Sequence, residues 1–224
     1  MEINFTKNKY CIIKKAVSKD IADLCYNYLT LKRKVAKSLF DINYIAPFEK
    51  MFGYFNDEQV PDTYSIYGDA LMETLLEKIM NTVEKNTKLK LTPNYSYARI
   101  YKNGDILHKH KDRFSCEIST TLFLGGDEWP IFVNPNPKEG FEKTENNQRS
   151  YIPSKDRGIE INLNPGDMLI YRGVELEHHR EAFKGQNCAQ VFLHYNNVKT
   201  KGSDLNIYDR RPHLGLPADI KIQR

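Results

Sequence analysis

The sequence predicts a mainly β fold with N-terminal helices, an α+β arrangement in which short strands form a sandwich or barrel. Two observations predict it. Apolar residues recur at helical spacing within the first ninety residues, and after Pro93 the spacing changes to the alternation that is typical of strands. The later segments are also rich in β-branched and aromatic residues and are separated by Gly and Pro, as strands joined by turns are.

Two helices are expected before the main strands. Ser18 can cap the first helix by accepting a hydrogen bond from its first turn. The apolar positions of this helix are Ile21, Leu24, Cys25, Tyr28 and Leu31. The second helix covers residues 69–85, and its apolar stripe contains Met72, Leu75, Leu76, Ile79, Met80 and Val83. Such stripes predict that both helices pack on one face of the strands.

A basic run, LKRKVAK, occupies residues 31–37. We interpret it as the end of the first helix, because cations stabilise a helix C-terminus. A patch that binds nucleic acid is the alternative interpretation.

Seven segments have the composition and alternation of strands. They are residues 10–14, 94–101, 116–124, 129–133, 159–163, 167–171 and 188–195. Two irregular segments interrupt this pattern. Residues 41–65 are aromatic-rich, and residues 134–157 are polar and longer than an ordinary loop, which predicts a mobile lid or a disordered insertion.

The length of 224 residues predicts one domain over residues 1–224. We expect residues 1–92 to supply helical support, residues 93–198 to form the β core and residues 199–224 to form a tail that lies over the domain. Apolar residues make up 40% of the chain and charged residues 28%, which excludes wholesale disorder.

The composition also restricts the environment of the protein. A mean hydropathy of −0.61 and the lack of a long apolar run exclude a membrane-embedded protein. The first residues do not have the layout of a signal peptide, so we expect a soluble cytoplasmic protein whose four cysteines are reduced thiols. The net charge of +4 permits an anionic partner without requiring one.

One motif carries the chemistry. His110 and Asp112 are separated by one residue, so on an extended strand an imidazole and a carboxylate share a face. A third ligand from a distant strand would complete the two-histidine, one-carboxylate set of non-heme Fe(II) oxygenases, which leaves coordination positions open. His178 or His179 can supply it. The pair of His110 and Asp112 alone is a weak signal for a metal site, so its interpretation depends on the surrounding sequence.

That context resembles a known family, the prolyl 4-hydroxylase-like branch of the 2-oxoglutarate and Fe(II)-dependent dioxygenases. The family has a strand with the pattern R-x-Y-x-x-G-x-x-x-x-x-H-x-D. The corresponding residues here are Arg99, Tyr101, Gly104, His110 and Asp112. The family then has a turn into a strand, a distal histidine and a glycine. Here these are Pro165, Gly166, Asp167, His178 and Gly185. The resemblance covers roughly residues 94–196.

The resemblance implies a double-stranded β-helix, or jelly roll, buttressed by helices, with iron at its open mouth. It implies His110, Asp112 and His178 as iron ligands and no catalytic side chain beyond the metal centre. His179 is the rival to His178. His108 is expected at the rim of the site, whereas His194 is expected to be an ordinary structural or surface residue.

The co-substrate anchor departs from the family pattern. Relatives place a Lys or Arg nine or ten residues after the distal histidine, where this chain has Asn187 and Cys188. We therefore expect Arg99 and Tyr101 to bind 2-oxoglutarate, because a buried Arg needs a carboxylate partner. Arg180 is the second choice and Lys184 the third.

Other residues have open roles. An ion pair of Arg99 with a residue such as Glu117 is the alternative to an anchor. Ser119 and Thr121 share a strand face and could donate to the co-substrate. Trp129 and Arg113 are candidates for the wall of the substrate pocket.

The resemblance further implies the reaction. It would use Fe(II), 2-oxoglutarate and O2, with ascorbate as a possible reductant, and would hydroxylate a C–H bond of a peptide, prolyl or small-molecule substrate. Succinate and CO2 would be the co-products, and no membrane partner is expected. The alternatives are a dioxygenase that acts on nucleic acid, which is not favoured, and a jelly-roll module that binds a ligand without catalysis.

Overall fold

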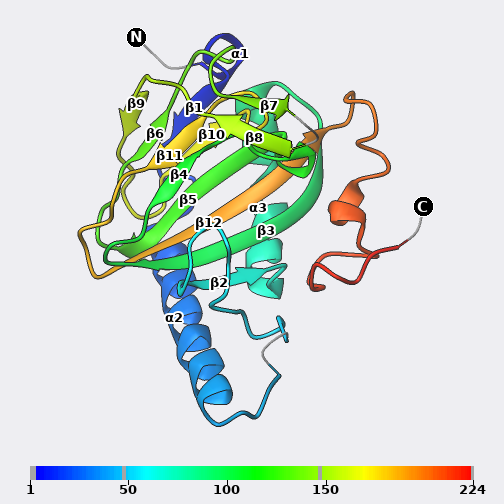
Figure 1. Ribbon diagram of the computed structural model, residues 1–224. Helices are drawn as coiled ribbons and strands as arrows, with labels where there is room; N and C mark the ends of the chain where they lie inside the picture. The colour runs from blue at the N-terminus through cyan, green and yellow to red at the C-terminus, as the bar shows by residue number, and fades with distance from the viewer. Residues whose placement is uncertain (1–3, 47–48, 146–147, 223–224) are drawn as a thin grey trace.

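The computed structural model describes residues 4–46, 49–145 and 148–222. Its two main sheets are antiparallel and pack on each other, which confirms the expected jelly roll (Figure 1). The larger sheet has the order β1 (Tyr10–Ile13), β10 (Met168–Tyr171), β5 (Ile118–Gly126), β12 (Asn187–Asn197), β3 (Leu91–Lys102) and β2 (Tyr64–Tyr67). The smaller sheet has the order β4 (Leu107–His110), β11 (His178–Arg180), β6 (Ile131–Val133) and β9 (Ile159–Ile161).

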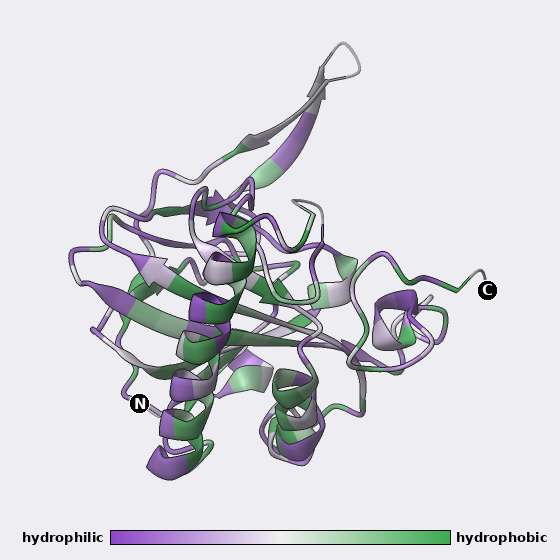
Figure 2. Ribbon diagram, turned by 90° about the horizontal axis from the view of Figure 1, so that it is seen from below, coloured by the Kyte–Doolittle hydropathy of each residue, from purple (hydrophilic) through white to green (hydrophobic). Residues whose placement is uncertain are grey.

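Two long helices cover the outer face of the larger sheet, as expected. α2 (Lys19–Asp41) begins at Ser18, whose side chain accepts a hydrogen bond from the backbone N–H of Ile21. α3 (Ala70–Thr87) begins at Asp69, which accepts from two backbone N–H groups of the first turn. Apolar and polar residues alternate along the helices (Figure 2), and their apolar sides form one core with the sheet. A short helix, α1 (Phe5–Asn8), precedes them.

Strand alternation divides the larger sheet into two faces. On β12, Val191 and Leu193 face the helices, whereas Cys188 and Phe192 face the smaller sheet. Between the two sheets lies a second apolar cluster, which also contains Tyr101 of β3. Every polar residue of the candidate site that lies on β3, β5 or β12 is therefore on the inner face.

α2 differs from the prediction in length and in the face that it buries. It continues to Asp41, so the basic residues 31–37 lie within the helix rather than at its end. The buried positions are Ala22, Cys25, Leu29 and Ala36. Leu24 and Leu31, expected on the apolar face, are 61% and 62% exposed. Three of these four buried residues, Ala22, Cys25 and Ala36, are small, which allows the helix axis to approach the sheet closely.

Residues 134–157 are not an unstructured insertion. They contain an antiparallel hairpin, β7 (Phe141–Glu145) and β8 (Gln148–Ile152), which projects from the body of the protein (Figure 2). Residues 146–147, within this expected lid, and residues 47–48, within the irregular segment 41–65, lie outside the described residues. The buried carboxylate of Glu177 holds the hairpin base by accepting hydrogen bonds from the Tyr151 hydroxyl and the Ser154 N–H.

Besides the hairpin strands β7 and β8, three strands lie outside the seven segments predicted from the sequence: β2, β4 and β11. Each has only three or four residues, too few for alternation to reveal it. The described part of the tail packs on the body through Arg211, which is fully buried and paired with Glu73 at 2.7 Å. Among the described residues, none of the helices is both long and apolar enough to cross a membrane.

The buried face of α2 predicts that two leucines on this helix differ strongly in their contribution to the free energy of unfolding. Leu29→Ala should lower the free energy of unfolding by about 2–5 kcal/mol, because Leu29 is 0% exposed and its removal leaves a cavity. Leu24→Ala should change it by less than about 0.5 kcal/mol. Urea denaturation measures both values. Equal losses would mean that α2 is rotated relative to the sheet.

Candidate active site

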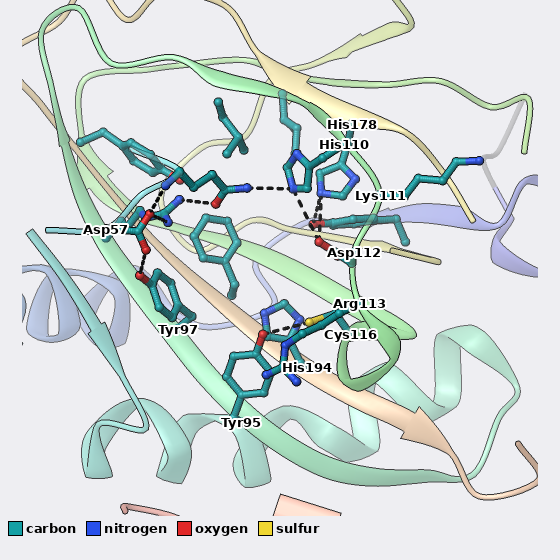
Figure 3. Close-up of a pocket in the computed structure, with 17 residues that line it drawn as sticks. Asp57, Tyr95, Tyr97, His110, Lys111, Asp112, Arg113, Cys116, His178 and His194 are labelled. Carbon is teal, nitrogen blue, oxygen red and sulfur yellow. Dashed lines mark hydrogen bonds and ion pairs between the residues drawn. The ribbon is translucent and has the colours of Figure 1, made fainter. Parts of the chain in front are cut away.

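Three side chains from two distant segments meet at one end of the smaller sheet (Figure 3). β4 and β11 are antiparallel neighbours, and His178 lies opposite His110 in the register. The Nε2 atoms of His110 and His178 are 3.6 and 3.5 Å from Asp112 Oδ1. One ligand atom from each residue lies within 4.8 Å of the others. The three atoms thus surround a space that suits one metal ion.

Backbone carbonyls fix both imidazoles. Nδ1 of His110 lies 2.7 Å from the His108 carbonyl, and Nδ1 of His178 lies 3.0 Å from the Leu176 carbonyl. A carbonyl only accepts, so each Nδ1 donates and each Nε2 keeps its lone pair for the centre. His179 points away and stacks on Phe132 with the ring centres 5.0 Å apart. Of the two rival histidines, His178 therefore joins the set.

Asp112 is held by contacts that the sequence did not indicate. Ser119 Oγ lies 2.7 Å from Asp112 Oδ2, which leaves Oδ1 toward the two histidines. The backbone N–H of Asp112 donates to the carbonyl of Gly173 at 2.9 Å. A Cβ atom at position 173 would lie 2.1 Å from Asp112 Oδ2, so only glycine leaves room for the carboxylate. The sequence left the role of Ser119 open between a donor to the co-substrate and a strand former, and in the structure its hydroxyl donates to the Asp112 carboxylate.

Burial and mutual charge set the protonation of the three residues. Burial, reinforced by the neighbouring His178, lowers the pKa of His110 to about 4. Burial alone would raise the pKa of Asp112, but the adjacent imidazoles outweigh it and the pKa falls well below its usual range. Asp112 in turn raises the pKa of His178 despite burial. The carboxylate is thus ionised and His110 neutral at physiological pH, as metal binding requires.

Arg180 lies on the same strand as His178 and is fully buried, with 1% of its surface exposed. No carboxylate among the described residues is within salt-bridge distance of it. Its guanidinium donates to the carbonyl of Trp129, lies 3.5 Å from Thr121 Oγ1 and leaves Nε without a partner. The buried hydroxyl of Tyr101 also accepts and donates no hydrogen bond of ordinary geometry in the described chain. Burial raises the pKa of Tyr101, and the neighbouring Arg99 and Arg180 act to lower it, so this hydroxyl lies near both guanidinium groups. Burial lowers the pKa of Arg180, which reflects the cost of this uncompensated cation.

Arg99 is paired, in contrast. Its Nη2 lies 2.6 Å from Asp57 Oδ1, its Nη1 donates to Gln59 Oε1 at 2.9 Å, and Asp57 also accepts from the Tyr97 hydroxyl. The expected alternative of an ion pair therefore holds for Arg99, with Asp57 rather than Glu117 as the partner. Because Arg99 fixes the oxygen of the Gln59 amide, the amide nitrogen faces His110 Nε2 at 3.3 Å (Figure 3).

A cavity of about 320 Å³ is lined by the three candidate ligands and by Arg99 and Tyr101, whereas Arg180 is not among the residues that line it. Tyr95, Arg113 and His194 also line this cavity. Arg113, a candidate for the wall of the substrate pocket, lines this cavity and is paired with Asp209 of the tail at 2.8 Å.

The remaining candidates lie elsewhere. Trp129 packs on Tyr101 and Arg180 in the interior, and it does not line the cavity. Lys184 is exposed and His108 faces solvent near the rim. The family anchor positions are also occupied differently, because Asn187 binds Arg33 and Cys188 is buried beside Arg180.

Three residues of the site have no role predicted from the sequence, namely Asp57, Gln59 and Gly173, and His194 was expected to be only an ordinary structural or surface residue. Asp57 and Gln59 lie in an irregular segment without periodicity, and nothing in the sequence pairs them with Arg99. His194 is an inward residue of β12, and its Nδ1 lies 3.1 Å from Ser119 Oγ. The alternation of β12 could have placed it on the inner face, two positions after Phe192.

Neither a protein-family model nor a curated protein sequence matches this chain. Solved structures match its fold. A prolyl-4-hydroxylase from Pseudomonas putida has a TM-score of 0.54 and 11% identity, and the match covers 86% of this chain and 95% of that protein. The epimerase SnoN, in complex with Fe3+, alpha ketoglutarate and nogalamycin RO, has a TM-score of 0.60 and 12% identity over 87% and 81%. EctD from S. alaskensis has a TM-score of 0.59 and 13% identity over 98% and 85%.

The chain has the jelly-roll fold of these proteins. The resemblance to 2-oxoglutarate-dependent oxygenases, expected from residues 94–196, is thus confirmed for the fold, and it extends over the N-terminal helices as well.

The contact between Gly173 and Asp112 predicts that Gly173→Ala lowers the free energy of unfolding by about 1–3 kcal/mol, the usual cost of overpacking. The added Cβ would meet both Asp112 Oδ2 and the Cys116 carbonyl at 2.6 Å or less. Urea denaturation of the purified variant measures the loss. A change below about 0.5 kcal/mol would contradict the position of the carboxylate.

Proposed function

We propose that this protein is an Fe(II)- and 2-oxoglutarate-dependent dioxygenase that hydroxylates a C–H bond of a small molecule or of a peptide side chain. One observation carries the proposal. A set of two imidazoles and a carboxylate lies beside a buried arginine that has no carboxylate partner among the described residues. The first feature fits a ferrous ion and the second fits a dicarboxylic co-substrate bound next to it.

His110, Asp112 and His178 would hold the iron. The unpartnered Nε of Arg180 and hydroxyl of Tyr101 are the groups that fit the distal carboxylate of 2-oxoglutarate. His178 and Arg180 are two residues apart on β11, which corresponds to roughly 7 Å along a strand. This separation is comparable with the length of the five-carbon acid. Arg180 thus replaces the basic residue that relatives carry near position 188, and it was our second choice for the anchor.

When bound, iron, 2-oxoglutarate and O2 would supply the oxidising chemistry, with succinate and CO2 as co-products. The protein supplies binding and orientation. Ser119 and the carbonyls of residues 108 and 176 aim the three ligand atoms. Asp57 and Gln59 cover the cavity from the side of Arg99 and would limit the access of water.

The size of the cavity supports a small reacting group. Its 320 Å³ must accommodate the co-substrate as well, so the remaining space suits a small molecule or a single side chain. The basic residues 31–37, which motivated the nucleic-acid alternative, belong to the helix on the outer face of the larger sheet, away from this cavity. The fold itself does not select the reaction, because its neighbours include a hydroxylase and an epimerase.

Two adjacent histidines provide a matched test of the metal ligands. His178→Ala should weaken Fe(II) binding by at least about 100-fold and should abolish Fe(II)-dependent release of succinate. His179→Ala should retain both, because this ring stacks on Phe132. Anaerobic titration calorimetry and a succinate assay with ascorbate measure the two properties. A non-catalytic binding module would release no succinate in either form.

The two buried arginines should respond in opposite directions to replacement by methionine. Arg180→Met should keep or raise the Tm of the ligand-free protein, because it removes an uncompensated buried cation. It should also abolish the stabilisation by 2-oxoglutarate in the presence of Mn(II), about 2.7 kcal/mol at a hundredfold excess over Kd.

Arg99→Met should instead lower the Tm, because it leaves Asp57 unpaired, and should retain a response to 2-oxoglutarate. Differential scanning fluorimetry separates the two variants. The reverse pattern would identify Arg99 as the anchor.

A further inference from the structure

A second group of oxidisable side chains lies next to the candidate metal ligands. The hydroxyl of Tyr95 on β3 and the thiol sulfur of Cys116 are 2.9 Å apart, and both residues line the cavity (Figure 3). The sulfur, an oxygen of Asp112 and a nitrogen of His194 all lie within 4.8 Å of one another. A phenol and a thiol are thus in contact at the edge of the proposed iron site.

The surroundings hold this pair in place. The ring of Tyr67 stacks on Tyr95 with centres 4.7 Å apart and planes 20° apart. The His194 ring centre lies 4.5 Å away, and the Arg113 guanidinium carbon is 4.7 Å from the centre of the Tyr95 ring. Cys116 ends a short 3-10 helix, η1 (Phe114–Cys116), and its carbonyl lies 2.9 Å from Ser119 Oγ. The hydroxyl of Tyr95 therefore stays against the sulfur.

The pair is also buried and neutral. Burial raises the pKa of both the Tyr95 phenol and the Cys116 thiol well above their ordinary values. A neutral buried thiol is a poor nucleophile and a poor partner for disulfide exchange. Cys116 is moreover free, with no disulfide partner in the described residues. The reaction open to it is oxidation together with the adjacent phenol.

We propose that Tyr95 and Cys116 form a thioether crosslink during turnover without substrate. In this step the S–H bond of Cys116 and a ring C–H bond of Tyr95, ortho to the hydroxyl, are broken and one S–C bond is formed. The two hydrogen atoms, which carry two electrons, and two further electrons from the oxidative decarboxylation of 2-oxoglutarate reduce O2, so that the products are water, succinate and CO2. The step rests on the proposed function for its oxidant.

The crosslink would join β3 to the segment that directly follows the candidate ligand Asp112. It would fix the wall formed by Tyr67, Tyr95 and His194, and would protect the thiol from stepwise oxidation. The modified chain would be lighter by two hydrogen atoms, and a thiol reductant would not reverse the change.

The experiment is intact-mass and peptide mass spectrometry after aerobic incubation of the full chain with Fe(II), 2-oxoglutarate and ascorbate. We expect a loss of two hydrogen atoms that persists after reduction, and a peptide in which residue 95 is joined to residue 116. Cys116→Ser and Tyr95→Phe should abolish the loss. Cys25→Ala should retain it, because Cys25 lies on the helix side of the larger sheet.

The outcomes distinguish this proposal from the proposed function. Release of succinate with an unchanged mass, with a mass loss that reductant reverses, or with oxygen added to Cys116 would refute the crosslink alone. Absence of both succinate release and Fe(II) binding would refute the dioxygenase and the crosslink together.

Discussion

The pairing of β4 with β11 is the constraint on which the candidate site depends. It places His178 opposite His110, and the turn after β4 brings Asp112 to both. Three polar groups are thereby concentrated where the protein excludes most water. Their charges compensate one another, since Asp112 is ionised and raises the pKa of His178. A proton and a bound cation would compete for the Nε2 lone pair of His178, which couples metal binding to the protonation of the site.

The interior between the sheets contains two arginines with different roles. Arg99 is stabilised by Asp57 and holds the segment that covers the cavity, so its cation contributes to the fold. Arg180 has no such compensation among the described residues, and its burial is costly in the absence of a ligand. Costly features persist where function requires them, and an uncompensated cation beside a metal site is suited to a carboxylate. The proposed co-substrate would thus stabilise the protein as it binds.

Sequence patterns predicted the features that arise from local periodicity. Both long helices, the main strands and the candidate ligands His110 and Asp112 follow from spacing and from motif context. The buried face of α2 was mistaken because apolar residues occur on both of its sides. The register of β11 is needed to place His178 rather than His179 beside His110 and Asp112. The ion pair that distinguishes Arg99 from Arg180 involves Asp57, which lies in an irregular segment. Gly173 supports Asp112 only through a steric contact, and no sequence pattern records such a contact.

The most direct test of the account is a crystal structure of the protein grown anaerobically with Fe(II) and 2-oxoglutarate. The account predicts one anomalous peak among His110 Nε2, Asp112 Oδ1 and His178 Nε2. It also predicts a carboxylate of the keto acid on the guanidinium of Arg180 and the hydroxyl of Tyr101. Iron bound elsewhere, or a keto acid on Arg99 with Arg180 still unpaired, would contradict it.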